Sequence, residues 1–335
     1  KRQVFCVLLF FSLIIGFLVK LSFIIVVGAI ICDFLYREKN RLNKKILITF
    51  TLGILAFLAV FILAIFATKL IYPVFSISGL ISHTESFINF GHRGWMQIII
   101  QAVKAIFYLS PILIVLLLLV TREIFEKTRI FFIYLVLGFI FYFILFDFSE
   151  GALDKYLMFS IVPLAVIAGS VIASVFNDNR GSKKITGIII GMLGSVLIIS
   201  LAFLPHNVPP LYPKSLFVSS VFHFKWNILF PFTGGSGPVG FYMSFIFIAC
   251  SFILSLVIGV AAFFKKEWKY HAVIAICMIS FTYNAIFVEE FLFGRLYGSA
   301  PIVLNESIDF IRNSPEIKRI ATYNDIGGYE LHRMN

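Results

Sequence analysis

Residues 241–264, FYMSFIFIACSFILSLVIGVAAFF, form an apolar run, and the basic link 265–270, KKEWKY, joins it to a second apolar run at 271–288. A membrane-spanning helix needs about 20 predominantly apolar residues. Each run therefore predicts a transmembrane helix. The shortness of the basic link predicts that the two helices form a hairpin.

The same pattern recurs along the chain, which has nine stretches that are apolar enough to span or nearly span a bilayer. They are residues 4–19, 21–36, 46–67, 96–120, 130–146, 156–176, 185–204, 241–264 and 271–288. We interpret Lys20, between the two short first stretches, as the turn of a tight hairpin; one long bent segment with Lys20 buried inside it is the alternative. The sequence predicts an all-α polytopic membrane protein with about nine transmembrane helices.

The composition agrees with a lipid environment. Of the 335 residues, 60% are hydrophobic and 13% are charged, whereas soluble domains have about 45–50% apolar and about 25% charged residues. These values exclude a disordered chain and an ordinary soluble enzyme. The net charge of +11 comes from short basic clusters between apolar runs, without a zinc-finger, recognition-helix or RNA-binding motif. Nucleic acid is therefore not an expected partner.

The distribution of Lys and Arg predicts which links face the cytoplasm, because short cytoplasmic links are usually rich in these residues. The predicted cytoplasmic segments are residues 1–2, 37–45, 121–129, 177–184 and 265–270. The predicted extracytoplasmic loops, which hold few basic residues for their length, are residues 68–95, 147–155 and 205–240. Long loops in compact proteins are often functional, so we expect the functional site of this multi-pass cell-membrane protein on the extracytoplasmic face.

Two regions follow from this pattern: a multi-span membrane domain at 1–288, and the start of a small extracytoplasmic α/β domain at 289–335. In the second region, Asn305 is predicted to cap a helix and residues 317–323 are predicted to form a strand. The chain opens with a basic pair and runs at once into an apolar stretch, and its polar tail stops where a second strand would begin. We therefore expect the chain to be incomplete at both ends.

The outer loop FDFSEGALDKY gathers Asp147, Glu150 and Asp154, followed by Lys155 and Tyr156. A cluster of carboxylates can hold a divalent cation through oxygen ligands. It can also contact the acceptor molecule of a transfer reaction. A lysine beside a tyrosine at the mouth of a span can contact the phosphate of a lipid carrier. The alternative interpretation is a solvated turn, because charged residues in loops often do nothing more than stay hydrated.

The loop at 68–95 contains His83, Glu85, His92 and Arg93. Arg93 is the strongest candidate to bind an anionic group, because its charge is permanent and its guanidinium forks to phosphate oxygens. The two histidines are candidate substrate contacts, since their spacing is not that of a metal motif, and Glu85 joins the acidic candidates. An interfacial amphipathic helix over about 76–90 is the structural alternative.

Lys104 lies eight residues into the predicted span 96–120. An ionisable residue within a span is costly and is therefore a candidate substrate contact, although it could also snorkel to the headgroups. In the loop at 205–240, His206, His223 and Lys225 are candidate sugar or phosphate contacts. The string FTGGSGPVG in that loop lacks the spacing of a nucleotide-binding loop.

Three motifs, taken in order, resemble those of GT-C type integral membrane glycosyltransferases, the class that includes protein O-mannosyltransferases and bacterial aminoarabinose transferases. GFLVKLSFIIV at 16–26 is similar to a span pair of that family. FGHRGW at 90–95, with Lys104 and LSPILIVLLLL after it, is similar to an outer Gly-His loop that leads into a span with Lys and Pro. DKYLMFSIVPLAVIAG at 154–169 is the best match, to a charged-Tyr-Leu loop and a Pro-Leu-Ala span.

The resemblance covers roughly residues 4–180 and implies an enzyme that moves a sugar from a polyprenyl-phosphate-linked donor to a lipid, glycan or protein acceptor, with membrane lipids around it. It implies that Arg93, Lys155 and Tyr156 contact the donor phosphate. The acidic catalytic residue of the family lies in a first outer loop that we expect upstream of Lys1, so no catalytic base is assigned. An O-antigen ligase-like protein or polymerase, a transporter or flippase, and a non-catalytic membrane subunit remain alternatives.

Overall fold

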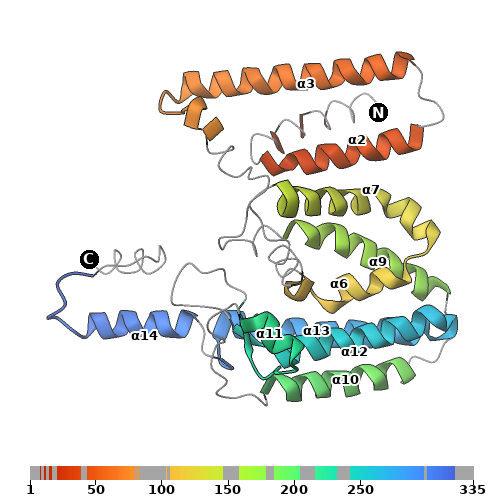
Figure 1. The fold of residues 1–335 in the computed structure, drawn as a ribbon, viewed down its shortest axis with the longest axis vertical. Helices are drawn as coiled ribbons and strands as arrows, with labels where there is room; N and C mark the ends of the chain where they lie inside the picture. The colour runs from red at the N-terminus through yellow and green to blue at the C-terminus, as the bar shows by residue number, and fades with distance from the viewer. Residues whose placement is uncertain are drawn as a thin grey trace. The chain divides into compact units, whose positions relative to one another are not determined.

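The computed structural model describes residues 8, 11–12, 15–16, 21–38, 44–79, 81–82, 103, 106–145, 158–178, 185–203, 216–231, 242–297 and 300–320. This part of the chain is mostly helical. It divides into two compact units, one formed by Lys1–Gly94 with Phe125–Phe148 and the other by Trp95–Ile124 with Ser149–Asn335. We refer to them as unit 1 and unit 2 (Figure 1).

Unit 1 contains the helices α2 (Ile24–Glu38) and α3 (Lys44–Ile71), most of α7 (Arg122–Phe139) and a π-helical turn (Ile140–Leu145). Helix α3 has 28 residues and is apolar on all sides, as expected for a helix surrounded by lipid. Helices α2 and α7 pack closely where Gly28 faces Leu137, since a Cβ added at Gly28 would lie 3.2 Å from the Leu137 Cδ1 atom.

Unit 2 is a helical bundle with one small β-hairpin. Its elements are α6 (Pro111–Val115), η2 (Leu116–Leu119), η4 (Met158–Ser160), α9 (Ile161–Asp178), α10 (Ile185–Phe203), α11 (Leu216–Phe222), β1 (Leu229–Pro231), β2 (Tyr242–Ser244), α12 (Phe245–Phe264), η5 (Lys266–Trp268), α13 (Lys269–Phe293) and α14 (Ala300–Arg312). The two strands are antiparallel, with Leu229 opposite Ser244 and Pro231 opposite Tyr242. The hairpin leads directly into α12.

A stripe of glycines joins α10 to α13. A Cβ added at Gly187 would lie 2.9 Å from the carbonyl oxygen of His271, and one added at Gly191 would lie 2.6 Å from the Met278 sulfur. A Cβ added at Gly194 would lie 2.8 Å from Ile279. Residue numbers rise together along both helices, so α10 and α13 run parallel. Small residues at such spacing allow the backbones of membrane helices to approach closely.

The core of unit 2 is aromatic where α12 and α13 meet. Phe247 stacks on Tyr283 with ring centroids 5.2 Å apart, and Phe252 meets the same ring edge to face at 5.9 Å. The wholly buried Tyr283 donates its hydroxyl proton to the carbonyl oxygen of Phe107 at 2.5 Å. A buried hydroxyl without a partner would be costly, so this bond makes a tyrosine tolerable inside the bundle.

Four helical segments among the described residues are long and apolar enough to cross a membrane: Thr51–Ile71, Ile185–Phe203, Phe245–Phe264 and Lys266–Phe293. They bear out an all-α membrane architecture, but the nine predicted spans are not all present as long apolar helices in the part that is described. Helix α2 has only 15 residues, and α9 falls among the shorter apolar helices. Helix α7 begins with charged turns, and most of residues 4–19 lie outside the described residues.

The sequence predicts a single membrane-spanning helix over residues 96–120. This prediction is wrong in the described part of that range, residues 103 and 106–120. Ser110 is extended (φ −70°, ψ 142°), α6 begins at Pro111, and after five residues the chain passes into the 3-10 helix η2. A proline has no N–H to donate and disfavours helical geometry in the residue before it. Pro111 therefore starts a short helix here instead of kinking a long one.

The predicted α/β tail is also corrected. Helix α14 begins at Ala300, so Asn305 lies inside it and does not cap it. Pro301 in the first turn favours this earlier start because its fixed φ suits a helix N-terminus. Residues 317–320 belong to neither a helix nor a strand, and the rest of the predicted strand 317–323 lies outside the described residues.

Candidate functional site

Ten of the site residues predicted from the sequence lie outside the described residues, so their roles stay predictions. They are His83, Glu85, His92, Arg93, Lys104, Asp147, Glu150, Asp154, Lys155 and Tyr156. His206 lies outside as well. His223 and Lys225 are described, and both are exposed at the end of α11.

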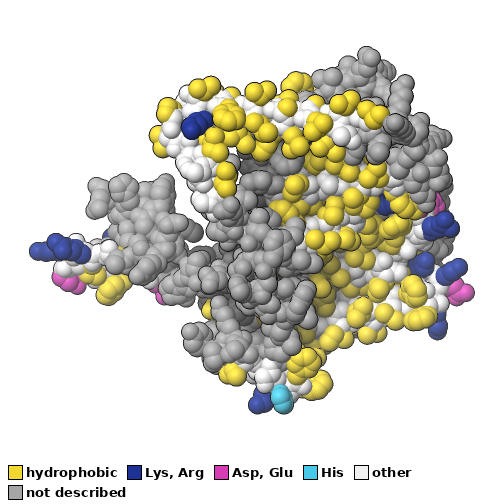
Figure 2. All heavy atoms as spheres, turned by 45° about the horizontal axis from the view of Figure 1, so that its top comes forward, with side chains coloured by type: hydrophobic (Ala, Val, Ile, Leu, Met, Phe, Trp, Pro, Cys, Tyr) yellow, Lys and Arg dark blue, Asp and Glu magenta, His cyan; other side chains and the backbone are white. Residues whose placement is uncertain are grey.

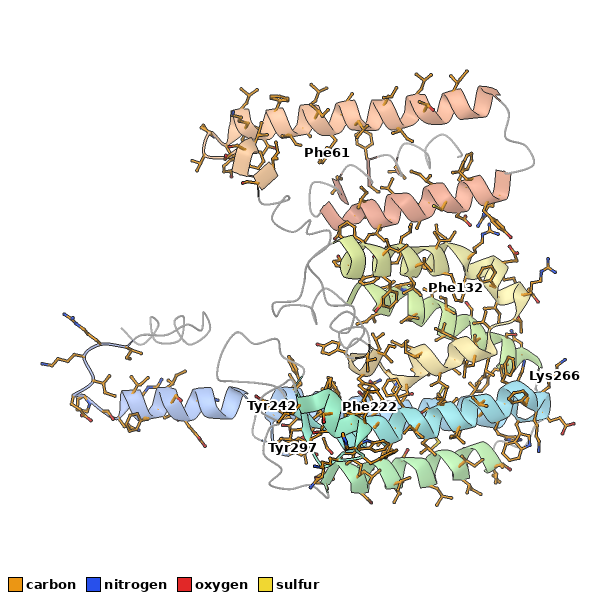
Figure 3. All side chains as sticks on the ribbon, viewed as in Figure 1. Phe61, Phe132, Phe222, Tyr242, Lys266 and Tyr297 are labelled. Atoms are coloured by element: carbon orange, nitrogen blue, oxygen red, sulfur yellow. The ribbon has the colours of Figure 1, made fainter. Side chains whose placement is uncertain are left out.

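Polar side chains that the sequence reading did not single out meet at one end of unit 2. The C-terminal ends of α10 and α13 lie there, together with the start of α12 and the β-hairpin. Figure 3 shows Phe222, Tyr242 and Tyr297 grouped at this end and Lys266 at the other end. We call Ser244, Glu290 and Tyr297 the polar cluster.

Glu290 is the buried acid of the polar cluster, with no exposed surface. Its Oε2 accepts the N–H of Leu296 at 2.9 Å, and its Oε1 accepts the N–H of Tyr297 at 3.2 Å. Helix α13 ends at Gly294, which is left-handed (φ 59°, ψ 36°) and donates its N–H to the Glu290 carbonyl oxygen at 3.0 Å. Glycine adopts this conformation without a Cβ clash, so the chain can turn back over the Glu290 side chain.

Tyr297 connects this turn to two other helices. Its hydroxyl donates to the carbonyl oxygen of Ala202, near the end of α10, at 2.5 Å, and it is also hydrogen-bonded to the Ser244 side chain. Burial, partly offset by the bond to Ser244, raises the pKa of Tyr297 to about 12. Ser244 in turn caps α12, since its hydroxyl accepts the N–H of Phe247 at 3.5 Å. The polar cluster therefore joins the ends of three long helices.

Aromatic rings lie beside the polar cluster. Trp226 donates its Nε1–H to the Val221 carbonyl oxygen at 3.2 Å and meets the Phe245 ring edge to face, with centroids 6.0 Å apart. Phe224, two residues before Trp226, has a positive φ of 56° and is 80% exposed. A bulky residue in this strained region is unusual, and here it holds a large apolar ring on the surface of the turn that carries His223 and Lys225.

A second polar group lies in unit 1, between α2 and α7. The Arg129 guanidinium is buried and lies 2.9 Å from Asp33 Oδ1 and 2.6 Å from Glu126 Oε2. The second oxygen of Asp33 pairs with the Arg37 Nε at 2.8 Å, and the Arg129 guanidinium carbon lies 4.0 Å from the centre of the Tyr36 ring. Buried charges need such partners. This group therefore joins two helices, and its buried guanidinium, that of Arg129, is paired with two carboxylates.

A shallow groove of about 510 Å³ follows the contact between α10 and α13. It is lined by Met192, Ser195, Val196, Cys277, Met278, Phe281 and Thr282. The Thr282 hydroxyl donates to the Ser195 hydroxyl at 3.0 Å, so the two polar groups of the groove satisfy each other. The groove presents an almost wholly apolar surface, as a lipid-facing surface should.

The arrangement limits what the described residues can do chemically. Both oxygens of Glu290 are taken by backbone N–H groups, so its role is to hold the turn. No group of three or more His, Cys, Asp or Glu side chains among these residues could hold a metal ion. Comparisons with protein-family models, curated proteins and solved structures find no match to this chain.

The one sequence signal for the polar cluster is the pair Glu289-Glu290 at the end of an apolar run, followed by Gly294. A pair of acids at this place looks like the hydrated end of a span. The two glutamates have different surroundings in the structure. Glu289 lies 3.8 Å from the exposed Arg295, whereas Glu290 is buried.

Proposed function

We propose that the chain is the membrane part of a glycosyltransferase that moves a sugar from a polyprenyl-phosphate-linked donor to a lipid, glycan or protein acceptor on the extracytoplasmic face of the cell membrane. The observation that carries the proposal is the order of the motifs at 16–26, 90–95 and 154–169. The apolar helices supply the membrane setting that such a donor requires (Figure 2), since hydrophobic side chains cover much of the visible described surface.

The described part of the third motif, residues 158–169, supports a common location for the donor site and the polar cluster. Phe176, near the end of α9, lies 5.2 Å from Tyr270, at the start of α13. Helix α9 therefore begins towards the opposite end of unit 2, where α13 finishes. Lys155 and Tyr156 lie three and two residues before Met158, the first residue of η4, in the sequence. This spacing supports a donor site at the end of unit 2 that carries the polar cluster.

The same geometry supports the proposed sidedness. Gly187, at the start of α10, contacts His271, at the start of α13. The described residues of the predicted cytoplasmic segments 177–184 and 265–270 therefore lie at one end of unit 2. Trp226, from the predicted loop 205–240, contacts Phe245 at the start of α12, at the other end. An extracytoplasmic site at the second end is consistent with this arrangement.

The proposed chemistry assigns a task to each predicted residue. The tail of the donor lies in the bilayer and its phosphate lies at the interface, so the enzyme needs cationic donors beside the phosphate. Arg93, Lys155 and Tyr156 fill this role. The acidic side chains of the two outer loops contact the acceptor or a divalent cation. A general base must activate the acceptor hydroxyl, and we assign that role to none of the residues of this chain.

The proposal is tested by measuring sugar transfer from a labelled polyprenyl-phosphate donor with the complete protein in membranes. Replacing Lys155 by Ala should raise the donor KM by about tenfold or more, the effect of losing a hydrogen bond to a charged group. Lys318→Ala is the matched control, because Lys318 is an exposed lysine that is not among the candidate substrate contacts. Unchanged transfer by the Lys155→Ala variant would refute the assignment of Lys155.

The enzyme class itself is tested by sequencing the coding DNA upstream of Lys1. An Asp or Glu pair in a first outer loop would supply the missing base. A first loop without any acid would instead favour a ligase-like or non-catalytic membrane protein.

A further inference from the structure

The turn between α12 and α13 carries three lysines within five residues. Lys265 leaves α12 with extended backbone (φ −112°, ψ 97°), and η5 follows at once. The Lys269 N–H donates to the carbonyl oxygen of Lys266 and closes the turn. Side chains three residues apart on a 3-10 helix lie one above the other. Lys266 and Lys269 therefore share one side of this turn.

The positive charge of the turn is not neutralised by other described residues. Lys265 and Lys266 are exposed and Lys269 is half-buried. Within the described part of the chain, none of the three forms an ion pair. Glu267 lies in the turn and offsets one of the three charges. The turn therefore presents a net positive charge to an anionic group.

Exposed aromatic side chains adjoin these lysines. Phe263 and Phe264, in the last turn of α12, are 58% and 78% exposed, and Trp268 is 45% exposed. The two phenylalanine rings meet edge to face with centroids 5.4 Å apart. Both belong to a helix that is long and apolar enough to cross a membrane, and tryptophan is typical of the membrane–water interface.

Tyr270 fixes the position of the turn. It is 2% exposed, and its ring lies 5.2 Å from the ring of Phe176 on α9. The lysines therefore extend from a segment anchored in the core of unit 2. A ligand bound here does not have to order the backbone first, which lowers the entropic cost of binding.

We propose that the α12–α13 turn binds the headgroup of an anionic phospholipid. The ammonium groups of Lys265, Lys266 and Lys269 contact the headgroup phosphate, and Phe264 and Trp268 contact the first methylene groups of the acyl chains. The adjoining aromatic surface favours a lipid over free phosphate, because free phosphate would make no use of it. Each lysine near an anionic membrane surface strengthens binding by about fivefold.

Quenching of Trp268 fluorescence by brominated lipids tests the proposal. The full chain is reconstituted in bilayers that mix phosphatidylglycerol and phosphatidylcholine, with bromine on one lipid or the other. The Trp268 signal is taken as the difference from a Trp268→Phe variant, since Trp95 and Trp226 are present in both chains. Brominated phosphatidylglycerol should bind beside Trp268 at least about fivefold more strongly than phosphatidylcholine.

The preference should disappear in the triple variant K265Q/K266Q/K269Q and persist in K225Q, which removes an exposed lysine at the other end of unit 2. Equal quenching by the two lipids, or a preference that survives the triple substitution, would overturn the proposal. Displacement of the brominated phosphatidylglycerol by inorganic phosphate, but not by chloride at matched ionic strength, would also overturn it, because the site would then be one for free phosphate.

Discussion

At the scale of single residues, the most consequential side chain is Glu290. A carboxylate buried at the C-terminal end of a helix lies at the unfavourable end of the helix dipole. Two backbone N–H groups compensate for this, and they are in turn satisfied by the carboxylate. Removing either the carboxylate or the N–H groups would therefore leave the other without a hydrogen-bond partner, at a cost in stability.

Replacing Glu290 by Ala should lower the free energy of unfolding by about 2 kcal/mol or more, because two partly buried N–H groups lose their acceptors. The measurement is unfolding of the purified protein in detergent. Glu289→Ala is the matched control and should change stability by less than about 1 kcal/mol, since its pair with Arg295 is long and exposed. Equal losses in the two variants would contradict the structural role of Glu290.

Tyr297 provides a prediction about pH. An unfolded tyrosine ionises near pH 10, whereas native Tyr297, with its pKa raised to about 12, keeps its proton at higher pH. The stabilisation that it contributes is therefore complete below pH 10 and is lost as the pH rises to about 12. Unfolding measured over this interval should be less steeply dependent on pH in Tyr297→Phe than in the unchanged chain. Tyr72→Phe, at an exposed position, should show the original slope.

At the scale of helices, the glycine stripe of α10 determines how closely α13 can pack. At Gly187 the atom that an added Cβ would meet is a backbone carbonyl oxygen, at 2.9 Å. Backbone cannot rotate away as a side chain can, so the helices themselves would have to separate. The atoms nearest to an added Cβ at Gly191 and Gly194 belong to the side chains of Met278 and Ile279, which can adjust more easily.

Gly187→Ala should therefore destabilise the protein by about 1–3 kcal/mol, the usual cost of overpacking. Gly169→Ala in α9 is the matched control. An added Cβ there meets nothing within 4 Å, so the better helix propensity of alanine should leave the protein equally or slightly more stable. Thermal unfolding in one detergent compares the two. Destabilisation by both variants would indicate a general cost of alanine, unrelated to the contact with α13.

The sequence predicted the apolar elements better than the sites. The runs at 185–204, 241–264 and 271–288 became α10, α12 and α13, because each has enough apolar residues to form a long helix without a breaker. The prediction of one helix over 96–120 is wrong at Pro111. The residues around it are apolar enough for a span, but the backbone at Ser110 is extended and a new short helix begins at Pro111. Glu290 was missed because its burial depends on Gly294 turning the chain back, a tertiary effect that an apolar pattern does not encode.

At the scale of the whole molecule, the distribution of polar groups gives unit 2 two different ends. The polar cluster lies at one end, with Phe222 and Tyr297, and the lysine-rich turn of α12–α13 lies at the other, with Lys266 (Figure 3). The turn with Lys225 belongs to the first end, because the adjacent Trp226 contacts Phe245 at the start of α12. If α10, α12 and α13 cross the bilayer as their length and composition indicate, these ends lie in different aqueous compartments.

Labelling of cysteines from one side of sealed membranes tests this separation. In a chain whose native cysteines are replaced by Ser, Lys225→Cys should react with a membrane-impermeant maleimide added outside the cell. Lys266→Cys should react only after the membranes are opened. Labelling of both positions in sealed membranes would contradict a membrane crossing between them.

The parallel pairing of α10 with α13 also bears on biosynthesis. The ribosome completes α10 well before α13, and α12 is made between them. Until α13 enters the bilayer, the glycine face of α10 contacts lipid chains. Lipid chains pack less closely against the depressions at these glycines than α13 does. A nascent chain interrupted before α13 would therefore carry an unmatched helix face, the kind of defect by which membrane quality-control proteases distinguish an unfinished protein from a finished one.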